Sequence, residues 1–562
     1  YNVFIFLTDT EDTMTLASTA KLTKPKQEFD PTPEQQAAIN MCLNGRDMKL
    51  IAFAGAGKTS TLVLLAKELN KQGKTGLYLA FNKAIADEAA KKMPNNVVSK
   101  TFHSLAYANA PNHIKSRLQK DCPSWEFQKI FRLAPFSVRV RETEIDYQAI
   151  LRGDVEDDAE NPPKRLISVK SSLISAVRQK YIIDTALTYF MRSDRNIPEI
   201  EDVHKAIKNN IDDILKDDIE VLAKELFPVV ELLWKDFTSP SGVIGMRGRH
   251  DVYLKLWALS KPKIKTDFIL FDESQDADPL MTGILRQQEA QIIYVGDPYQ
   301  QIYGWRGAVN VMQDLKVQAS YLTQSFRFGQ DLADACQPLL EVLGSENSIR
   351  GLDSLTTVVD VDEKSPSSFD ALLCRTNAGA IKACLEYQGL GILVTPMNVD
   401  FKETREMVLG IEELRKLGTT ECAALRGFPS YDSLQEFVSE YKTDTSIAPY
   451  YRLNEKFGVE TIIELIDRCE SDKSKKVKGS IATTAHRSKG LEWDTVVLSD
   501  DFCGAFQNYT GEFKEKPNEE EYRLLYVAMT RAKKKAYFAQ IHNILLHVKS
   551  KRKNQALNAF DL

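Results

Sequence analysis

The chain has 562 residues, of which 43% are hydrophobic and 27% are charged, a composition that is ordinary for a globular protein. This length exceeds what one hydrophobic core supports and predicts three or four domains. Seventy-three Lys and Arg residues against 78 Asp and Glu residues give a net charge of −5. The overall charge therefore does not favour a nucleic-acid partner, although a local basic channel is compatible with an acidic whole.

The eight cysteines are scattered and form no C-x-x-C pair. This pattern predicts reduced thiols and argues against a zinc ribbon or an iron–sulfur cluster. No apolar run reaches the length that a membrane-spanning helix needs. Residues 1–7 are apolar, but acidic residues follow them and no basic region precedes them, so they do not resemble a signal peptide. We expect a cytoplasmic protein, or a nuclear one in a eukaryote, without a membrane partner.

In chain order, the first strong feature is residues 52–59, which read Ala-Phe-Ala-Gly-Ala-Gly-Lys-Thr. An apolar run precedes them and leucines at helical spacing follow, the pattern of strand, loop and helix. The backbone N–H groups of such a loop bind phosphate, Lys58 would reach the β- and γ-phosphates, and the Thr59 hydroxyl would hold Mg²⁺. Ala52 replaces the first glycine of the general pattern, so a flexible turn beside a surface lysine is the competing interpretation. The predicted nucleotide contacts are Ala54, Gly55, Ala56, Gly57, Lys58, Thr59 and Ser60.

The remaining chain alternates between two patterns. Strands and helices alternate up to residue 106, which predicts a parallel sheet, whereas residues 107–235 read mostly helical and predict an inserted domain. Strand signals return at residue 266, and a second sheet is expected to begin near Tyr321. Residues 1–28 and 549–562 are expected to be tails. The predicted organisation is a first core (29–106 and 236–317), a helical insertion in it (107–235), a second core (318–396 and 475–548) and a small helical insertion in that core (397–474).

An apolar strand at residues 268–271 ends in the acid pair Asp272 and Glu273. Asp272 can enter the Mg²⁺ shell opposite Thr59, while Glu273 can accept a proton from an attacking water molecule. An acid pair at a strand end is by itself commonly a solvated feature. Its combination with Lys58 upstream favours ATP hydrolysis.

The order of motifs resembles superfamily 1 DNA helicases of the UvrD/Rep type. In that family the first loop reads A-x-A-G-x-G-K-T, so the resemblance accounts for Ala52. The sequences of residues 250–257, 300–310 and 322–329 most resemble the helicase core of F-box DNA helicases. No F-box-like segment precedes Gln35, so a ubiquitin-ligase role is not predicted. The blocks that resemble the later family motifs are residues 295–307, 322–327, 484–492 and 526–531.

The resemblance implies an α/β fold with two RecA-like parallel-sheet cores and two mainly helical inserted domains. ATP and Mg²⁺ would lie between the cores, and closure of the cores around ATP would drive movement on DNA. In such enzymes an arginine from the second core, called an arginine finger, reaches the γ-phosphate and contributes roughly 10³–10⁵ in rate to phosphoryl transfer. The implied ATP-side roles are adenine reading by Gln35, adenine stacking by Phe326, a ribose contact by Glu492, γ-phosphate sensing by Gln300, and arginine fingers from Arg327 and Arg531.

On the DNA side, the resemblance implies contacts to single-stranded DNA, including a duplex with a 3′ single-stranded tail, and 3′→5′ polarity. Trp305 is the strongest candidate for a base-stacking platform, since stacking contributes roughly 1–3 kcal/mol per base whatever the sequence. Packing within its own glycine-flanked loop is the alternative. The implied DNA contacts are Phe81, Asn82, Thr101, Phe102, His103, Tyr303, Trp305, Arg306 and His486.

The insertion at residues 397–474 looks shorter than the one typical of UvrD-type members. Because that domain regulates unwinding in the family, the resemblance predicts movement along DNA more directly than it predicts strand separation. Two other classes therefore stay open. One is a translocase that strips proteins from DNA without efficient unwinding, and the other is an ATPase subunit of a larger defence or repair assembly, with a protein partner that the sequence does not identify.

Overall fold

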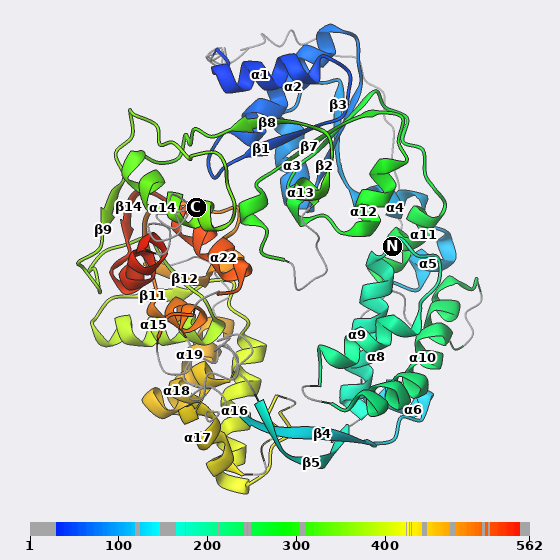
Figure 1. The fold of residues 1–562 in the computed structure, drawn as a ribbon, viewed down its shortest axis with the longest axis vertical. Helices are drawn as coiled ribbons and strands as arrows, with labels where there is room; N and C mark the ends of the chain where they lie inside the picture. The colour runs from blue at the N-terminus through cyan, green and yellow to red at the C-terminus, as the bar shows by residue number, and fades with distance from the viewer. Residues whose placement is uncertain are drawn as a thin grey trace, which may run out of the picture.

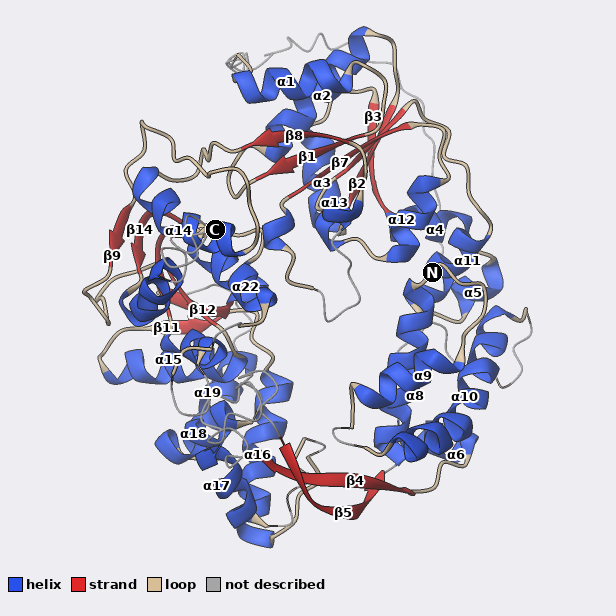
Figure 2. Ribbon diagram, viewed as in Figure 1, coloured by secondary structure: helices blue, strands red, loops and turns tan. Residues whose placement is uncertain are grey.

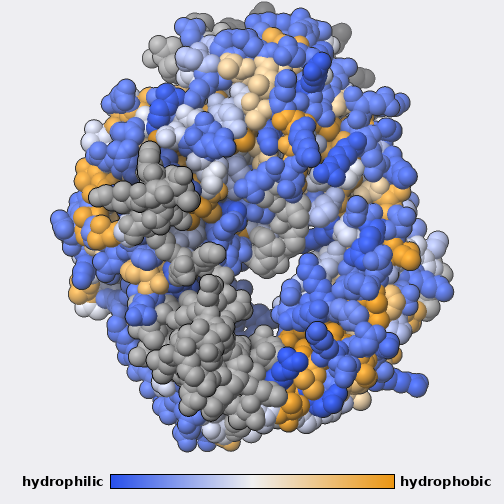
Figure 3. Space-filling view, in the orientation of Figure 1, coloured by the Kyte–Doolittle hydropathy of each residue, from blue (hydrophilic) through white to orange (hydrophobic). Residues whose placement is uncertain are grey.

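The computed structural model shows an α/β protein with two sheets and two insertions arranged around a central opening (Figures 1, 2 and 3). Within the described part of the chain, no helix combines the length and the apolar character that crossing a membrane requires. The structure describes residues 30–118, 124–145, 164–174, 176–211, 214–240, 244, 249–303, 311–422, 424–425, 428, 430–440, 447–471, 479–507, 512–514 and 517–550.

The first sheet has six strands that all pair in parallel. Its central strands are almost wholly buried because helices cover both faces, as is usual for parallel sheets. Helices α1 (Pro33–Cys42), α2 (Lys58–Lys71) and α3 (Lys83–Lys92) pack on one face, and α4 (Phe102–Asn109), α11 (His250–Leu259) and α12 (Pro279–Arg286) on the other. The strand order is β3 (Val97–Thr101), β2 (Gly76–Ala80), β6 (Phe268–Phe271), β7 (Gln291–Gly296), β1 (Met48–Ala52) and β8 (Gln318–Leu322).

Strand β8 corrects the expectation that the second sheet begins near Tyr321. Tyr321 instead lies opposite Ile51 of β1, at the edge of the first sheet. The pairing joins segments about 270 residues apart in the chain, and no local sequence pattern encodes such a partner. The chain leaves the first sheet only after Leu322.

The second sheet also has six strands that pair in parallel. Its core includes α14 (Gln330–Val342) and α22 (Glu519–Met529), while α15 (Asn377–Gly389) packs on the other side. Short helices α13 (Val311–Asp314), α20 (Ala485–Ser488) and α21 (Cys503–Phe506) complete the two cores. The strand order is β11 (Val394–Pro396), β12 (Ser480–Thr484), β10 (Ala371–Cys374), β13 (Trp493–Leu498), β14 (Ala532–Tyr537) and β9 (Val358–Asp360).

A carboxylate fills the turn that follows β10 in the second sheet. Asp501 accepts hydrogen bonds from the backbone N–H of Arg375 at 2.8 Å and of Thr376 at 2.9 Å, and from the Thr376 hydroxyl at 3.0 Å. Gly379 in the first turn of α15 leaves room for it, because a Cβ there would lie 2.1 Å from Asp501 Oδ2. This turn therefore already holds an anion that belongs to the protein.

The first insertion is mainly helical but contains a feature that the sequence interpretation missed. Strands β4 (Phe136–Ile145) and β5 (Lys164–Ile174) form a long antiparallel ribbon. Apolar and polar residues alternate from Phe136 to Arg141, so a period of two was present in this part of the sequence. The helices of this insertion are α5 (Asn112–Ser116), α6 (Ser124–Phe131), α8 (Ala176–Arg192), α9 (Ile200–Lys208) and α10 (Lys216–Thr238); the described second insertion contains α16 (Phe401–Leu417), α17 (Tyr431–Glu440), α18 (Ala448–Phe457) and α19 (Val459–Ser471).

Candidate active site and nucleic-acid interface

The glycine-rich loop joins β1 to α2 in the conformation that a phosphate loop requires. Gly55 and Gly57 have φ values of 73° and 77°, in the left-handed region that glycine adopts without steric cost. No side chain caps the first turn of α2, so its backbone N–H groups and the helix dipole favour an anion there. The predicted contacts Ala54, Ala56, Thr59 and Ser60 belong to the same loop and helix start.

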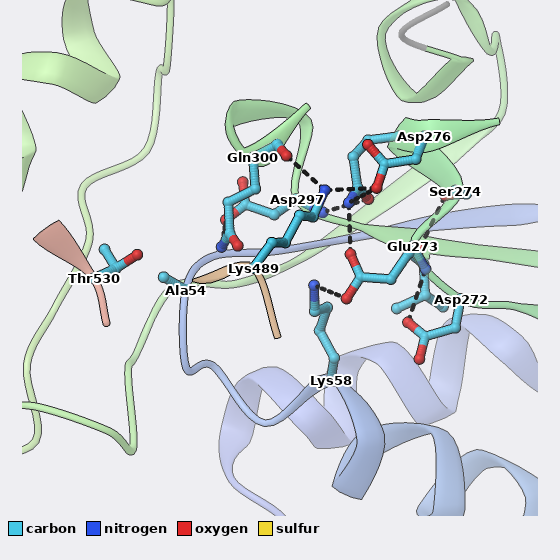
Figure 4. A network of polar contacts seen from close by, with 12 residues as sticks. Ala54, Lys58, Asp272, Glu273, Ser274, Asp276, Asp297, Gln300, Lys489 and Thr530 are labelled. Carbon is cyan, nitrogen blue, oxygen red and sulfur yellow. Dashed lines mark hydrogen bonds and ion pairs between the residues drawn. The ribbon is translucent and has the colours of Figure 1, made fainter. Parts of the chain in front are cut away.

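Lys58 and Glu273 face each other at the carboxyl end of the first sheet (Figure 4). The Lys58 Nζ atom lies 2.9 Å from Glu273 Oε1. Glu273 has φ 52° and ψ 38°, a conformation that costs a non-glycine residue energy and that tends to occur at functional sites. Burial acts to raise the pKa of Glu273, but the charges of Lys58 and Lys489 more than offset it and hold that pKa at about 2. Glu273 is thus an ionised acceptor.

Two further carboxylates lie beside this pair. Asp272 Oδ2 accepts a hydrogen bond from the Tyr78 hydroxyl at 2.5 Å, and burial together with the charge of Glu273 raises its pKa. Asp297, which follows β7, is fully buried, and burial raises its pKa to about 6. The carboxyl ends of neighbouring parallel strands meet at one edge, which is why residues after β1, β6 and β7 converge here.

The second core contributes Arg531, which is 2% exposed and lies immediately before β14. Its guanidinium donates to the Val527 carbonyl at 2.8 Å and to Gln300 Oε1 at 3.3 Å. Burial and the nearby charge of Arg327 lower the pKa of Arg531 to about 9, so a negative group at this position would be strongly favoured. Gln300 in turn donates to Asp297 Oδ2 at 2.6 Å.

Arg327 lies directly against the phosphate loop. A Cβ atom on Gly55 would be 2.7 Å from the Arg327 Cβ atom, a distance that real Cβ contacts do not show. Arg327 Nε is 2.8 Å from Glu492 Oε2, and its Nη1 donates to the Thr530 carbonyl at 2.9 Å. The two residues for which separate finger and ribose roles are predicted therefore pair with each other in this arrangement.

Gln35 and Phe326 lie on the other side of the same loop. The Phe326 ring is 3.4 Å, and Gln35 Nε2 is 3.6 Å, from the position that a Cβ on Gly57 would take. The Gln35 amide donates to the Thr61 hydroxyl at 3.1 Å and accepts from the Thr32 backbone N–H at 3.0 Å. An aromatic face and an amide therefore converge beside Gly57, as adenine reading requires.

Lys489 and Tyr526 are among the residues of the site that the sequence interpretation missed, although both stand within quoted motif blocks. Lys489 Nζ lies 2.5 Å from Asp276 Oδ2 and donates to the Gln300 carbonyl at 2.7 Å (Figure 4). The Tyr526 hydroxyl accepts from the Ala54 backbone N–H at 3.1 Å. Both contacts join the second core to the first. The only signal for them in the sequence was that a lysine and a tyrosine stand at motif positions to which no role had been assigned.

The predicted DNA contacts Phe81, His103 and Tyr303 line one cavity of about 220 Å³. The rings of Phe81 and Tyr303 are stacked, with centroids 6.1 Å apart and planes 3° from parallel. The Tyr303 hydroxyl donates to the backbone carbonyl of His486, another predicted contact, at 3.4 Å. Asp251, Asp276 and Asp278 also line this cavity, so it combines aromatic rings with carboxylates.

Other predicted DNA contacts have different positions. Phe102 is 2% exposed and packs edge-on against Phe271. Its ring is therefore buried in the core and not available for DNA, contrary to the expectation. The side chains of Thr101 and Asn82 cap the N-termini of α4 and α3. Helix capping therefore accounts for a threonine and an asparagine at these positions. Trp305 and Arg306 lie outside the described residues.

Comparisons with known proteins agree with this geometry. The UvrD/REP helicase N-terminal domain matches residues 31–318, just over half of the chain, and the UvrD-like helicase C-terminal domain matches residues 429–543. F-box DNA helicase 1 of Gallus gallus is 29% identical over 90% of this chain and 49% of its own length. F-box DNA helicase protein 1 of Schizosaccharomyces pombe is 30% identical over 90% of this chain and 57% of its own length. The chain thus spans about half the length of these relatives.

The crystal structure of the Pif1 helicase from Candida albicans aligns over 91% of this chain and 95% of its own, at 12% identity and a TM-score of 0.29, which is too low to support a conclusion. The family assignment rests on the two domain matches. This chain belongs to the UvrD/Rep family of superfamily 1 helicases.

Proposed function

We propose that this chain is an ATP-driven motor that moves 3′→5′ on single-stranded DNA and separates the strands of a duplex with a 3′ single-stranded tail. The observation that supports this most strongly is that two arginines of the second core contact the first core, one at the phosphate loop and the other at Gln300. Arg327 packs against Gly55, and Arg531 contacts Gln300. A nucleotide bound to the loop would therefore touch both cores at once.

The chemistry follows from the charges at the loop. The N-terminus of α2 and Lys58 bind the phosphates, while Glu273, held ionised, accepts a proton from the attacking water. Arg327 and Arg531 stabilise the charge that develops on the transferred phosphoryl group. Hydrolysis removes the group that both cores hold, so the cores separate and the cycle moves DNA.

Thr59 and Asp272 would hold Mg²⁺. Both offer oxygen atoms, which this ion prefers, and Mg²⁺ at nucleotide sites usually takes only one or two protein ligands together with phosphates and water. Among the described residues, no group of three or more His, Cys, Asp or Glu side chains is placed to hold a metal ion. Bound there, the ion neutralises phosphate charge.

On the DNA side, we propose that the cavity beside Phe81 and Tyr303 receives a base and that His103 and His486 lie along the strand. Asn82, Thr101, Trp305 and Arg306 remain proposed contacts from the family pattern. Phe81 is 38% exposed, so part of the residue is accessible to a ligand.

A fluorescently labelled duplex tests the proposal in one experiment. With a 3′ tail, ATP-dependent strand release supports a helicase, whereas release only from a 5′ tail would overturn the polarity. DNA-stimulated ATP hydrolysis without release would instead support a translocase that strips proteins from DNA. ATP hydrolysis that DNA does not stimulate would support an ATPase subunit whose activity depends on a protein partner.

A further inference from the structure

The segment that leaves β8 carries two of the proposed ATP contacts and is held at its start by Glu34. The Thr323 backbone N–H donates to Glu34 Oε2 at 2.8 Å, and the Thr323 hydroxyl donates to Glu34 Oε1 at 2.6 Å. Phe326 and Arg327 follow three and four residues later. Glu34 therefore fixes the point from which this segment departs.

Arg350 completes the contact from the other side. Its Nη2 atom donates to Glu34 Oε1 at 2.6 Å, and its backbone N–H donates to the Thr323 carbonyl at 3.0 Å. The Arg350 carbonyl then accepts from the Ser325 backbone N–H at 2.7 Å. We call the three residues Glu34, Thr323 and Arg350 the Glu34 clasp.

The far end of the segment is tied to the phosphate loop. The Phe326 backbone N–H donates to the Gly55 carbonyl at 2.8 Å, and the Phe326 ring lies beside Gly57. Gln35 faces the same glycine and is the residue after Glu34 in α1. The clasp therefore sets the separation between α1, which carries Gln35, and the ring of Phe326.

The parts of the clasp differ in strength. The Arg350 side chain is 55% exposed, and an ion pair of such exposure contributes little. Thr323 is 8% exposed, and its two hydrogen bonds to a carboxylate are charge-assisted and therefore stronger than neutral ones. Burial acts to raise the pKa of Glu34, but these bonds and Arg350 more than offset it and lower that pKa, so the carboxylate is ionised.

We propose that Glu34 is a positioning residue for adenine recognition, which acts through Thr323 to hold the Phe326 ring opposite Gln35. The inference rests on the proposed function, because it assumes an adenine nucleotide at the phosphate loop. Glu34 does not touch the phosphates. Its loss weakens the contribution of the base to binding and leaves that of the triphosphate unchanged.

The test compares two ligands on the full chain. In Glu34→Ala, the dissociation constant for ATP rises about tenfold, while that for inorganic tripolyphosphate, which has no base, is unchanged. Glu34→Gln keeps one acceptor oxygen and gives a smaller rise. Thr323→Val removes the hydroxyl, which donates to Glu34 and accepts from Arg350, and keeps the backbone hydrogen bond to Glu34. Glu68→Gln, which alters an exposed pair with Lys71, is the matched control and binds both ligands as the wild type does. Equal weakening for ATP and tripolyphosphate, or no weakening for either, overturns the inference.

A double mutant shows whether Glu34 acts through Phe326. In a Phe326→Ala background, adding Glu34→Ala causes no further loss of ATP affinity, because the ring that it positions is gone. Additive losses overturn the inference even if the single variants behave as expected. A wild-type chain that binds no ATP would overturn the proposed function and this inference together, whereas normal ATP binding by Glu34→Ala overturns only the latter.

Discussion

The Nζ atom of Lys489 lies 2.5 Å from Oδ2 of Asp276, although the two residues belong to different cores. The same ammonium group donates to the Gln300 carbonyl and lies 5.2 Å from the centroid of the Tyr303 ring. Its charge also lowers the pKa of Glu273. One lysine side chain thus touches the proposed nucleotide site and the aromatic cavity at the same time.

Replacing Lys489 by Met should uncouple these two regions. The methionine keeps an apolar stem but leaves Asp276, which is 5% exposed, as a buried carboxylate without its cation. We expect the ratio of DNA-stimulated to basal ATP hydrolysis to fall at least about tenfold, as steady-state assays with and without single-stranded DNA would show. The double variant Lys489→Met/Asp276→Asn removes the unpaired charge; if it regained full stimulation, the lysine would not be the link.

Lys58→Ala should abolish DNA-stimulated ATP hydrolysis. The variant loses the cation that faces Glu273 and the proposed contact with the β- and γ-phosphates. A coupled phosphate-release assay measures the loss. Lys71→Ala, at the exposed end of the same helix, serves as the control. Turnover like that of the wild type in Lys58→Ala would contradict the whole assignment.

Arg531→Ala should reduce turnover by roughly 10³–10⁵ while ATP affinity changes by only a few-fold, because a finger stabilises the transition state more than the ground state. Single-turnover hydrolysis and nucleotide titration measure the two quantities separately. An equal effect on both would indicate a binding role instead. Arg468→Ala, at an exposed site in the second insertion, provides the comparison.

Asp297 should make the nucleotide-free protein less stable as the pH rises. Burial raises its folded pKa to about 6 from an ordinary value of 3.8, so the folded state binds this proton more tightly than the unfolded state. The resulting stability is present below about pH 4 and is lost as the pH rises through about 6, a difference on the order of 3 kcal/mol. Asp297→Asn should show a smaller change in melting temperature between pH 5 and pH 8. The same change in both proteins would contradict the expected ionisation.

Binding of single-stranded DNA should weaken with salt despite the net charge of −5. If a basic groove follows the phosphates, the logarithm of affinity falls linearly with the logarithm of salt concentration. Fluorescence anisotropy with labelled oligonucleotides at several salt concentrations gives the slope. A flat response would leave stacking in the Phe81–Tyr303 cavity as the main source of affinity.

Much of the first core could be predicted because buried parallel strands read as continuous apolar runs. Strand β6 has the predicted bounds, and β7 extends the apolar run of residues 292–295 by one residue at each end. Motif order also predicted that residues as distant as Lys58 and Arg531 act at one site. Roles that depend on one residue's own neighbours were harder: Phe102 packs on Phe271 because its helix faces the sheet, which a motif position does not reveal.

Contacts between distant segments were beyond reach for a physical reason. The pairing of β8 with β1, the Glu34 clasp and the Lys489–Asp276 pair all join parts of the chain more than 200 residues apart. Local periodicity encodes the faces of helices and strands but not their partners. Glu34 in particular reads from the sequence only as an acidic residue in a first helical turn, where the helix dipole alone accounts for it.

The carboxylate of Asp501 has a consequence for stoichiometry. In the first sheet, the turn after β1 offers its N–H groups to an incoming anion, whereas in the second sheet the comparable turn after β10 is permanently neutralised by a side chain of the same protein. Of these two turns, only the one in the first sheet is therefore open to a phosphate group. We therefore expect each chain to bind a single ATP molecule, at the phosphate loop that follows β1.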